Sequence, residues 1–363
     1  MFSGKMNYHD YLQIDRLLSA QKLESEGRLN QPAHDEMLFI VVHQVYELWF
    51  KLILTEISSV LDIFNQDHID ERLMDLIVAR LQRVVEIQKL LVDQVRIVET
   101  MTPLDFLEFR DLLIPASGFQ SFQFRVLETR LGLRRDNRLR YNQKDYDQLL
   151  KPEQRQLMTK VEAEPSLFDR VEKWLERTPF LDMQGFDFRQ LYKQTVESGL
   201  KRDLEIIQRN PALGPEDRQR NETLLQASLD SFQALFDEPN YKAARERGEW
   251  RLSFRAIHAA LLIQLYRDQP ALQLPFRVLT ALQDMDEWMT TWRHRHALMA
   301  KRMLGAKVGT GGSSGYQYLR DATDKHKVFN DLFQLTTFFV PRSQLPPLPK
   351  DVERSLSFQY ADK

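Results

Sequence analysis

The sequence reads MDEWMTTWRHRHALMAKRMLGAKVGTGGSSG from Met285 to Gly315, and this stretch decides the fold class. Six side chains recur at alternating steps of four and three residues: Met285, Met289, Trp292, His296, Met299 and Met303. That spacing places them on one face of an α-helix. Residues 305–315 then hold five of the chain's 13 glycines and cannot continue a stable helix. The stretch therefore predicts a buried helix whose end leads into a mobile, glycine-rich loop.

The histidine on this face is the informative residue. His296 falls on the apolar stripe, whereas His294 points about 160° away on a helix of 3.6 residues per turn. An imidazole buried without a hydrogen-bond partner is costly. Two interpretations follow for His296. It is either a core histidine bonded to a carbonyl oxygen, or a ligand of a metal or haem iron whose Met and aromatic neighbours wall a pocket for a large flat cofactor.

Composition narrows the class of partner and the compartment. The 363 residues include 50 Lys plus Arg and 52 Asp plus Glu, so a net charge of -2 offers no general field for nucleic acid or an anionic membrane. With no cysteine, the chain has no disulfide, thiolate nucleophile, cysteine zinc site or cysteine-ligated haem. The N-terminal residues lack a basic-then-apolar signal pattern, and no apolar run approaches the ~18 residues of a membrane span, so we expect neither secretion nor membrane insertion. We therefore expect a cytoplasmic protein with a small-molecule or protein partner.

A second histidine lies on another apolar helix. The four-and-three alternation runs from residue 35 to about 64, and the stripe next to it is also apolar, which predicts a buried helix. His43 lies on this face, with Phe39 one turn before it. Residues 69–99 form a third long, amphipathic helix. Histidines on two separate core helices favour a shared site.

The remaining pattern predicts an all-α fold, because no alternating strand pattern is found. We expect a large helical bundle-type domain over residues 31–340. Within it, residues 134–250 are polar and read as an inserted smaller region of shorter helices and loops. Residues 1–30 form an N-terminal arm of the kind that docks on a neighbouring subunit, and residues 341–363 form a Pro-rich tail.

Two further features bear on ligands. Arg110 precedes a break at residues 115–121 between apolar helices, where it either pairs with a nearby aspartate or, beside a pocket, holds a carboxylate in a bidentate fork. The glycine loop lacks the Gly-Lys-Ser/Thr of a phosphate-binding loop and follows a helix instead of a strand. This argues against nucleotide binding.

Several blocks, in this order along the chain, resemble the tryptophan 2,3-dioxygenase family. They are YHDY from Tyr8, HDEMLFIVVHQ from His34, ELWFK from Glu47, Arg110, PASGFQS from Pro115 and GTGGSSG from Gly309. The resemblance covers most of the chain. Its length and polar middle segment look more like the animal-type members than the shorter bacterial ones.

The resemblance implies a cofactor and roles for particular residues. It implies one haem b per subunit, with His296 as the proximal ligand of the iron. It implies that His43 faces the indole nitrogen, that Phe39 is its pocket neighbour and that Arg110 clamps the substrate carboxylate. Thr310 matches the threonine that contacts the ammonium and carboxylate end. The other matching pocket positions are Tyr8, Tyr11, Leu113, Ser117 and Gly118.

The implied activity is the insertion of both atoms of O2, the co-substrate, across the indole C2=C3 bond of L-tryptophan. The product is N-formylkynurenine, and this is the first step of the kynurenine pathway. The resemblance also implies a homotetramer whose N-terminal arms cross between subunits. Other classes stay open: a related indole-oxidising haem enzyme of broader substrate range, a non-catalytic haem sensor or carrier, or a purely helical scaffold. An absorption spectrum of the ferrous protein with and without L-tryptophan under O2 separates them.

Overall fold

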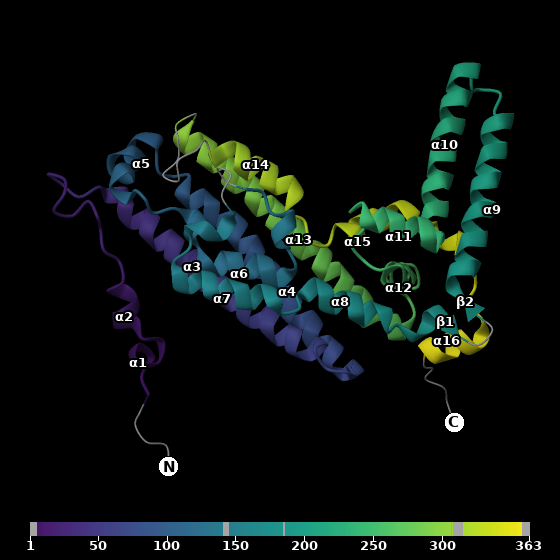
Figure 1. Cartoon of the computed structure of the whole chain (residues 1–363), viewed down its shortest axis with the longest axis horizontal. Coiled ribbons are helices and arrows are strands. Elements are labelled where there is room, and N and C mark those ends of the chain that lie inside the picture. Colours follow the sequence, from purple (N-terminus) through teal and green to yellow (C-terminus); the bar gives the residue numbers. More distant parts are fainter. Residues whose placement is uncertain (1–5, 141–144, 184–185, 306, 308–314, 358–363) are drawn as a thin grey trace, which may run out of the picture. The chain divides into compact units, whose positions relative to one another are not determined.

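The structure is a computed structural model that describes residues 6–140, 145–183, 186–305, 307 and 315–357, and helices dominate it (Figure 1). The α-helices are α1 (Tyr8–Leu12), α2 (Ile14–Leu18), α3 (His34–Phe64), α4 (Glu71–Val98), α5 (Pro103–Arg110), α6 (Phe122–Leu131), α7 (Pro152–Ala163), α8 (Leu167–Glu176), α9 (Phe188–Arg209), α10 (Pro215–Phe236), α11 (Glu238–Glu246), α12 (Phe254–Leu265), α13 (Pro270–Leu304), α14 (Gly315–Lys325), α15 (Asn330–Gln334) and α16 (Lys350–Leu356). The 3-10 helices are η1 (Asp111–Leu113), η2 (Gly118–Gln120), η3 (Arg135–Asn137), η4 (Tyr146–Leu149), η5 (Pro179–Leu181), η6 (Leu335–Phe338) and η7 (Arg342–Gln344).

One β-hairpin interrupts the helices without changing the fold class. Strands β1 (Asp182–Met183) and β2 (Phe186–Asp187) have two residues each and pair antiparallel. The predicted all-α fold is confirmed. The predicted helices over residues 35–64 and 69–99 are confirmed as α3 and α4. The described helices within residues 134–250 are shorter than α3, α4 and α13, and the longest of them, α9 and α10, have 22 residues each.

The chain forms two compact units, each assembled from separate stretches of sequence. The first unit comprises residues 1–58, 83–164 and 287–327. The second comprises residues 59–82, 165–286 and 328–363. Helices α3, α4 and α13 contribute residues to both units.

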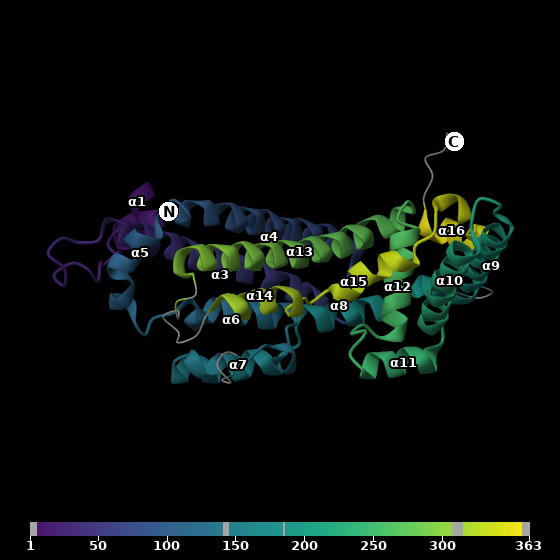
Figure 2. The ribbon, with the colours of Figure 1, turned by 90° about the horizontal axis from the view of Figure 1, so that it is seen from above.

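In the first unit, α3, α4, α6 and α13 lie alongside one another (Figure 2). Tyr46 of α3 links two of its neighbours, since its hydroxyl donates to the carbonyl of Leu91 on α4 at 2.7 Å and its ring lies 6.2 Å from that of Trp292 on α13. Phe124 of α6 also contacts Trp292, with ring centroids 5.2 Å apart. Aromatic contacts of this kind fix the spacing of the four helices.

Helix α13 ends where the sequence predicts. Gly305 follows its last residue with φ of 59°, a left-handed conformation that glycine adopts without steric cost. Its amide donates to the carbonyl of Lys301 at 2.8 Å and closes the last turn. The predicted glycine-rich loop over residues 305–315 lies largely outside the described residues, which resume at Gly315, the first residue of α14.

The burial of α3 differs between its two ends. Ile53, Ile57 and Val60 are fully buried, as the apolar pattern predicts. In the first half, however, Met37 and Leu48 expose 41% and 50% of their surface. The prediction that this helix is buried around its girth is therefore wrong for the single chain, because part of the apolar surface faces a cavity or the outside.

The sequence showed no apolar run long enough to span a membrane, and α3 is the described helix that tests this expectation. By length and composition it is apolar enough to cross a membrane, with a mean hydropathy of 1.6. The central helix of a folded core meets the same criteria. Glu47 and Glu56 on α3 are held by hydrogen bonds or ion pairs to side chains of α6 and α4, and a packed core helix accounts for these contacts.

The second unit is built around α12, in which every residue from Ala256 to Leu265 is buried. Helices α9 and α10 form an antiparallel hairpin (Figure 1). At its base, Tyr192 of α9 packs on Phe232 of α10, and its hydroxyl donates to the carbonyl of Phe338 at 2.6 Å. This aromatic base anchors the hairpin to the rest of the unit.

Candidate functional site

The first unit contains a partly open cavity of about 310 Å³. Most of its wall is apolar, with Phe39 and Val42 from α3, Val98 from α4, and Met299 and Met303 from α13. Both histidines singled out in the sequence, His43 and His296, line this cavity. A concave apolar space with a few polar groups is the usual form of a cofactor or substrate site.

His296 extends from α13 into the cavity wall. Its ring stacks on that of Trp292, one turn earlier, with centroids 5.3 Å apart and an interplanar angle of 4°. Burial, with a smaller contribution from the nearby His43, lowers the pKa of His296 to about 4. His294 is exposed, as the helix phase predicts. His296 is therefore a neutral imidazole at pH 7.

The ring nitrogens of His296 accept and donate no hydrogen bond among the residues that the structure describes. The first interpretation of His296, a core histidine hydrogen-bonded to a carbonyl oxygen, is therefore not supported, because no described carbonyl oxygen bonds to its ring. A neutral imidazole with a free nitrogen lone pair is the form that binds a metal. Within the described ranges, no cluster of three His, Cys, Asp or Glu residues suits a bare metal ion. A metal centre at His296 must therefore bring most of its own ligands.

His43 lies on α3, and its tautomer follows from its hydrogen bond. Nδ1 lies 2.7 Å from the carbonyl oxygen of Phe39, so Nδ1 carries the proton and donates it. Burial lowers the pKa of His43, against the opposing effects of the Phe39 carbonyl and the Glu47 carboxylate. The Phe39 ring packs beside the imidazole at 4.1 Å between centroids. Nε2 of His43 is thus left as a hydrogen-bond acceptor.

Arg110 is the last residue of α5, and it is not among the described residues that line the cavity. Its guanidinium lies 3.1 Å from Asp111, and 14% of its side chain is exposed. Phe106, four residues earlier and hence on the same face of α5, does line the cavity. The structure therefore places Arg110 one helical turn from the cavity and beside an aspartate.

The other expected pocket positions divide into three groups. Ser117 and Gly118 line the cavity, and Leu113 packs against the hydrophobic cluster that includes Val42, Phe39 and Met303. Tyr8 and Tyr11 lie on α1 with exposed fractions of 71% and 69%, away from the described lining. Thr310 lies outside the residues that the structure describes.

Glu47 is a cavity residue to which the sequence analysis gave no role. Its carboxylate accepts hydrogen bonds from Ser121 Oγ at 2.6 Å and from Gln123 Nε2 at 2.8 Å, which joins α3 to the start of α6. The sequence held a signal for it, because Glu47 follows His43 by four residues and so shares its helix face. Glu47 fixes the side of the cavity that carries His43.

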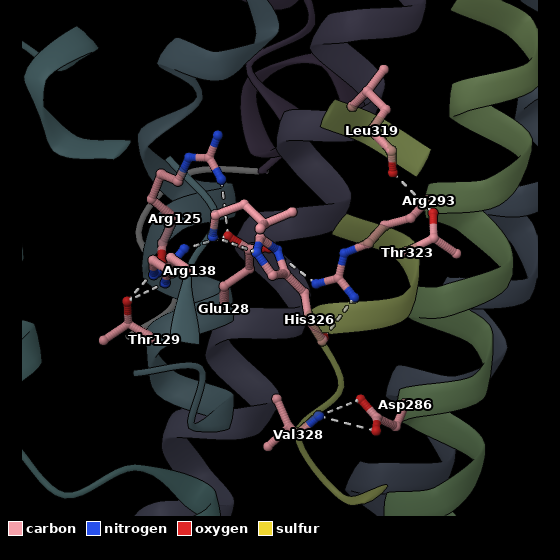
Figure 3. Close-up of polar contacts among 11 residues, drawn as sticks. Arg125, Glu128, Thr129, Arg138, Asp286, Arg293, Leu319, Thr323, His326 and Val328 are labelled. Carbon is pink, nitrogen blue, oxygen red and sulfur yellow. Dashed lines mark hydrogen bonds and ion pairs between the residues drawn. The ribbon is translucent and has the colours of Figure 1, made fainter. Parts of the chain in front are cut away.

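A buried ionic cluster borders the cavity, which three of its residues line: Arg125, Glu128 and Arg293 (Figure 3). Helical periodicity did not predict it. Its centre is the carboxylate of Glu128 on α6, of which 1% is exposed. Oε2 accepts from Arg125 at 3.0 Å and from Arg138 at 2.6 Å, and Oε1 accepts from Arg293 of α13 at 3.0 Å. We call these four residues the Glu128 cluster. Burial alone raises the pKa of Glu128, but the three guanidinium groups and His326 hold it well below its usual range.

His326 follows α14 and borders the Glu128 cluster. Its Nε2 accepts from the backbone amide of Leu139 at 3.1 Å, so the proton lies on Nδ1, which is 3.7 Å from Glu128. Burial lowers the pKa of His326, although the Glu128 carboxylate opposes that shift. With His326 neutral, three buried cations face one carboxylate. This part of the cavity wall therefore carries excess positive charge.

Comparisons with known proteins show the family of this chain. A family model for tryptophan 2,3-dioxygenase matches residues 1–339. A tryptophan 2,3-dioxygenase of Bdellovibrio bacteriovorus is 55% identical over 98% of this chain and 99% of its own length. The Dictyostelium discoideum protein of that name is 46% identical over 98% of this chain and 88% of its own, and the Xenopus laevis one is 47% identical over 97% and 87%. The chain belongs to the tryptophan 2,3-dioxygenase family.

Proposed function

We propose that this chain is a haem-dependent dioxygenase that adds both atoms of O2 across the indole C2=C3 bond of L-tryptophan to give N-formylkynurenine, the first step of tryptophan degradation by the kynurenine route. One observation carries the proposal. His296, neutral and free at its ring nitrogens among the described residues, lines the same apolar cavity as His43, in a chain of this family.

The residues present fit a haem b. His296 supplies one neutral nitrogen ligand, which is what a five-coordinate haem iron requires. The apolar wall, with Val98, Met299 and Met303, suits the faces of a macrocycle. We propose that His296 holds the iron and that one haem binds per subunit.

When bound, the haem supplies the activation of O2 for attack on the indole ring. The chain's own residues then bind, orient and enclose the substrate. His43 offers Nε2 as acceptor for the indole N–H, and Phe39 packs beside its ring. Because burial keeps His43 neutral, it orients the indole without first carrying a charge.

The charged end of the amino acid needs other groups. We propose that Arg110 turns from Asp111 to the substrate carboxylate, which it can hold in two parallel hydrogen bonds. Thr310 is proposed to contact the ammonium and carboxylate groups. Ser117, Gly118 and Leu113 are proposed as further substrate-binding residues.

The N-terminal arm supports a site shared between subunits. Helices α1 and α2 have five residues each and bury none of them, and isolated helices of that length are unstable in water. Met6, Tyr8, Tyr11 and Leu18 expose between 69% and 76% of their surface. We propose a homotetramer in which residues 1–30 of one subunit bring Tyr8 and Tyr11 to the pocket of the next subunit. We also propose that the protein is cytoplasmic.

The test uses the haem-loaded, ferrous protein under anaerobic conditions. L-tryptophan should perturb the Soret band, and admission of isotopically labelled O2 should give N-formylkynurenine that carries both labelled atoms. A protein with a Soret band that forms no product would instead be a haem sensor or carrier. Product from many indoles at similar kcat/KM would indicate the related enzyme of broader substrate range.

A further inference from the structure

We infer that Glu128 is a positioning residue for the iron-binding helix: its buried carboxylate, clamped by Arg125 and Arg138, holds Arg293 and through it the orientation of His296 (Figure 3). The inference rests on the proposed function, because it takes His296 as the iron ligand. It concerns what fixes that ligand, and not which residue the ligand is.

Arg293 is placed to control the rotation of α13 near His296. It lies three residues before His296, which is about 300° around the helix and roughly 4.5 Å along it, so the two side chains are neighbours on the helix surface. Its Nη2 donates to Glu128 Oε1 at 3.0 Å and its Nη1 donates to the carbonyl oxygen of His326 at 3.0 Å. Only 8% of the side chain is exposed. Because both Nη1 and Nη2 of Arg293 are held, α13 can rotate little at this position.

The carboxylate that holds Arg293 is itself fixed from the other side. Arg125 and Arg138 both donate to Oε2, at 3.0 and 2.6 Å, while Arg293 donates to Oε1. Arg138 also donates to the hydroxyl of Thr129, one residue after Glu128, at 2.8 Å. Glu128 therefore has no freedom to follow a movement of Arg293. The position of the Glu128 carboxylate therefore determines the position of Arg293 on α13.

The three arginines of the cluster differ in one respect that makes the inference testable. Arg293 alone of them lies on α13, whereas Arg125 lies on α6 and Arg138 follows η3. All three are at most 8% exposed, so replacing any one of them by lysine disturbs hydrogen bonds to the same buried carboxylate. If the cluster only stabilises the fold, replacements at Arg138 and Arg293 will have the same consequences. If Glu128 positions His296, the change at Arg293 will reach the iron more strongly than the change at Arg138, which acts only through Glu128 while Arg125 still holds that carboxylate.

The experiment compares the same substitution at three positions in the haem-loaded protein. Arg293→Lys keeps the cation but a single ammonium cannot reproduce the fork between Glu128 and His326. Arg138→Lys makes the matched change on the same carboxylate without touching α13. Arg295→Lys is the control on α13 itself, because Arg295 pairs with a different carboxylate, Glu99, at 2.9 Å. The readouts are the iron–histidine stretching frequency of the ferrous protein by resonance Raman spectroscopy, and kcat and KM for L-tryptophan.

The expected result is a shifted iron–histidine frequency in Arg293→Lys, with kcat lower by about 10-fold or more and KM changed less than about 2-fold. Arg295→Lys should keep the parent frequency, and Arg138→Lys should shift it less than Arg293→Lys does, because Arg125 still holds Oε2 of Glu128. Arg138→Lys should also melt at a lower temperature. The frequency is measured on molecules that hold haem, so partial unfolding reduces the band without moving it. If Arg293→Lys yields no folded protein, Glu128→Asp, which draws the carboxylate back by one methylene, must show the same shift.

An unchanged frequency in Arg293→Lys, or an equal shift in Arg138→Lys, would overturn the inference while the proposed function stands. A parent protein that binds haem without an iron–histidine band would overturn both, because His296 would then not be the ligand.

Discussion

The acid sensitivity of the second unit should depend on one buried histidine. His258 of α12 is fully buried between the rings of Phe236 and Phe254, whose centroids lie 4.7 and 4.5 Å from its own. Its Nδ1 donates to the carbonyl of Phe254 at 2.6 Å, and its Nε2 has no hydrogen-bond partner among the described residues. A second proton on this ring would therefore place a charge and an unpaired N–H in an apolar site.

The magnitude follows from the pKa. Burial lowers the pKa of His258 from 6.5 to about 4, with a smaller lowering by Arg189, while the Phe254 carbonyl, Asp187 and Glu238 oppose the shift. Because the folded protein binds fewer protons at this site than the unfolded chain, stability falls as the pH drops from 6.5 towards 4. Linkage gives a loss of about 2 kcal/mol between pH 7 and pH 5, approaching roughly 3 kcal/mol below pH 4.

The assay is denaturant unfolding of the haem-loaded protein at pH 7 and pH 5, for the parent and for His258→Phe. Phenylalanine has a similar flat ring but is larger than histidine and cannot be protonated. The variant should therefore lose about 1–3 kcal/mol at pH 7 through overpacking, and lose about 2 kcal/mol less than the parent on acidification. His294→Phe, on the exposed side of α13, should keep the parent's pH dependence. The other buried histidines contribute alike to all three proteins. Equal acid losses in the parent and His258→Phe would refute the reasoning.

Four further predictions concern the proposed site. His296→Ala should abolish stable haem binding whereas His294→Ala keeps a normal Soret band, and the reverse outcome in absorption spectra would show that the helix phase is misassigned. Arg110→Lys should lower kcat/KM for L-tryptophan by about 10- to 100-fold at unchanged haem content, through loss of the bidentate fork; an unchanged kcat/KM removes Arg110 from the carboxylate site. His43→Ser should retain measurable dioxygenation in a product assay, and complete inactivity with substrate still bound would assign His43 as an obligatory base. Thr310→Ala should weaken L-tryptophan binding and narrow the L-over-D preference in titrations, so an unaltered preference speaks against a contact with the amino acid.

Helical periodicity predicted what depends on one helix at a time. The alternation of four and three residues separated His296 from His294 correctly, because the sides of one helix are set by its own geometry. The same reasoning placed His43 beside Phe39 on α3 and predicted the end of α13 at its glycine. It overestimated the burial of α3, because periodicity shows that a face is apolar without showing what covers it. Met37 and Leu48 are apolar and exposed in the single chain.

Arg293 marks where this reasoning stops. A stripe drawn through Trp292 and His296 leaves Arg293 outside the apolar face, and a charged residue there reads as solvated. In the structure Arg293 is only 7% exposed, because it forms an ion pair with Glu128 on α6. Glu128 lies 165 residues away in the sequence, so the spacing along α13 cannot reveal this partner. Glu128 and Arg125 at a spacing of three on α6 read as an ordinary surface pair, and nothing in that spacing reveals a third and fourth partner. The Glu128 cluster, bordered by His326 after α14, forms only when α6, α13 and α14 pack together. Helical periodicity therefore cannot predict residues that orient an iron ligand without touching the iron. In a structure, such residues can be sought in buried ion pairs about one helical turn from the ligand.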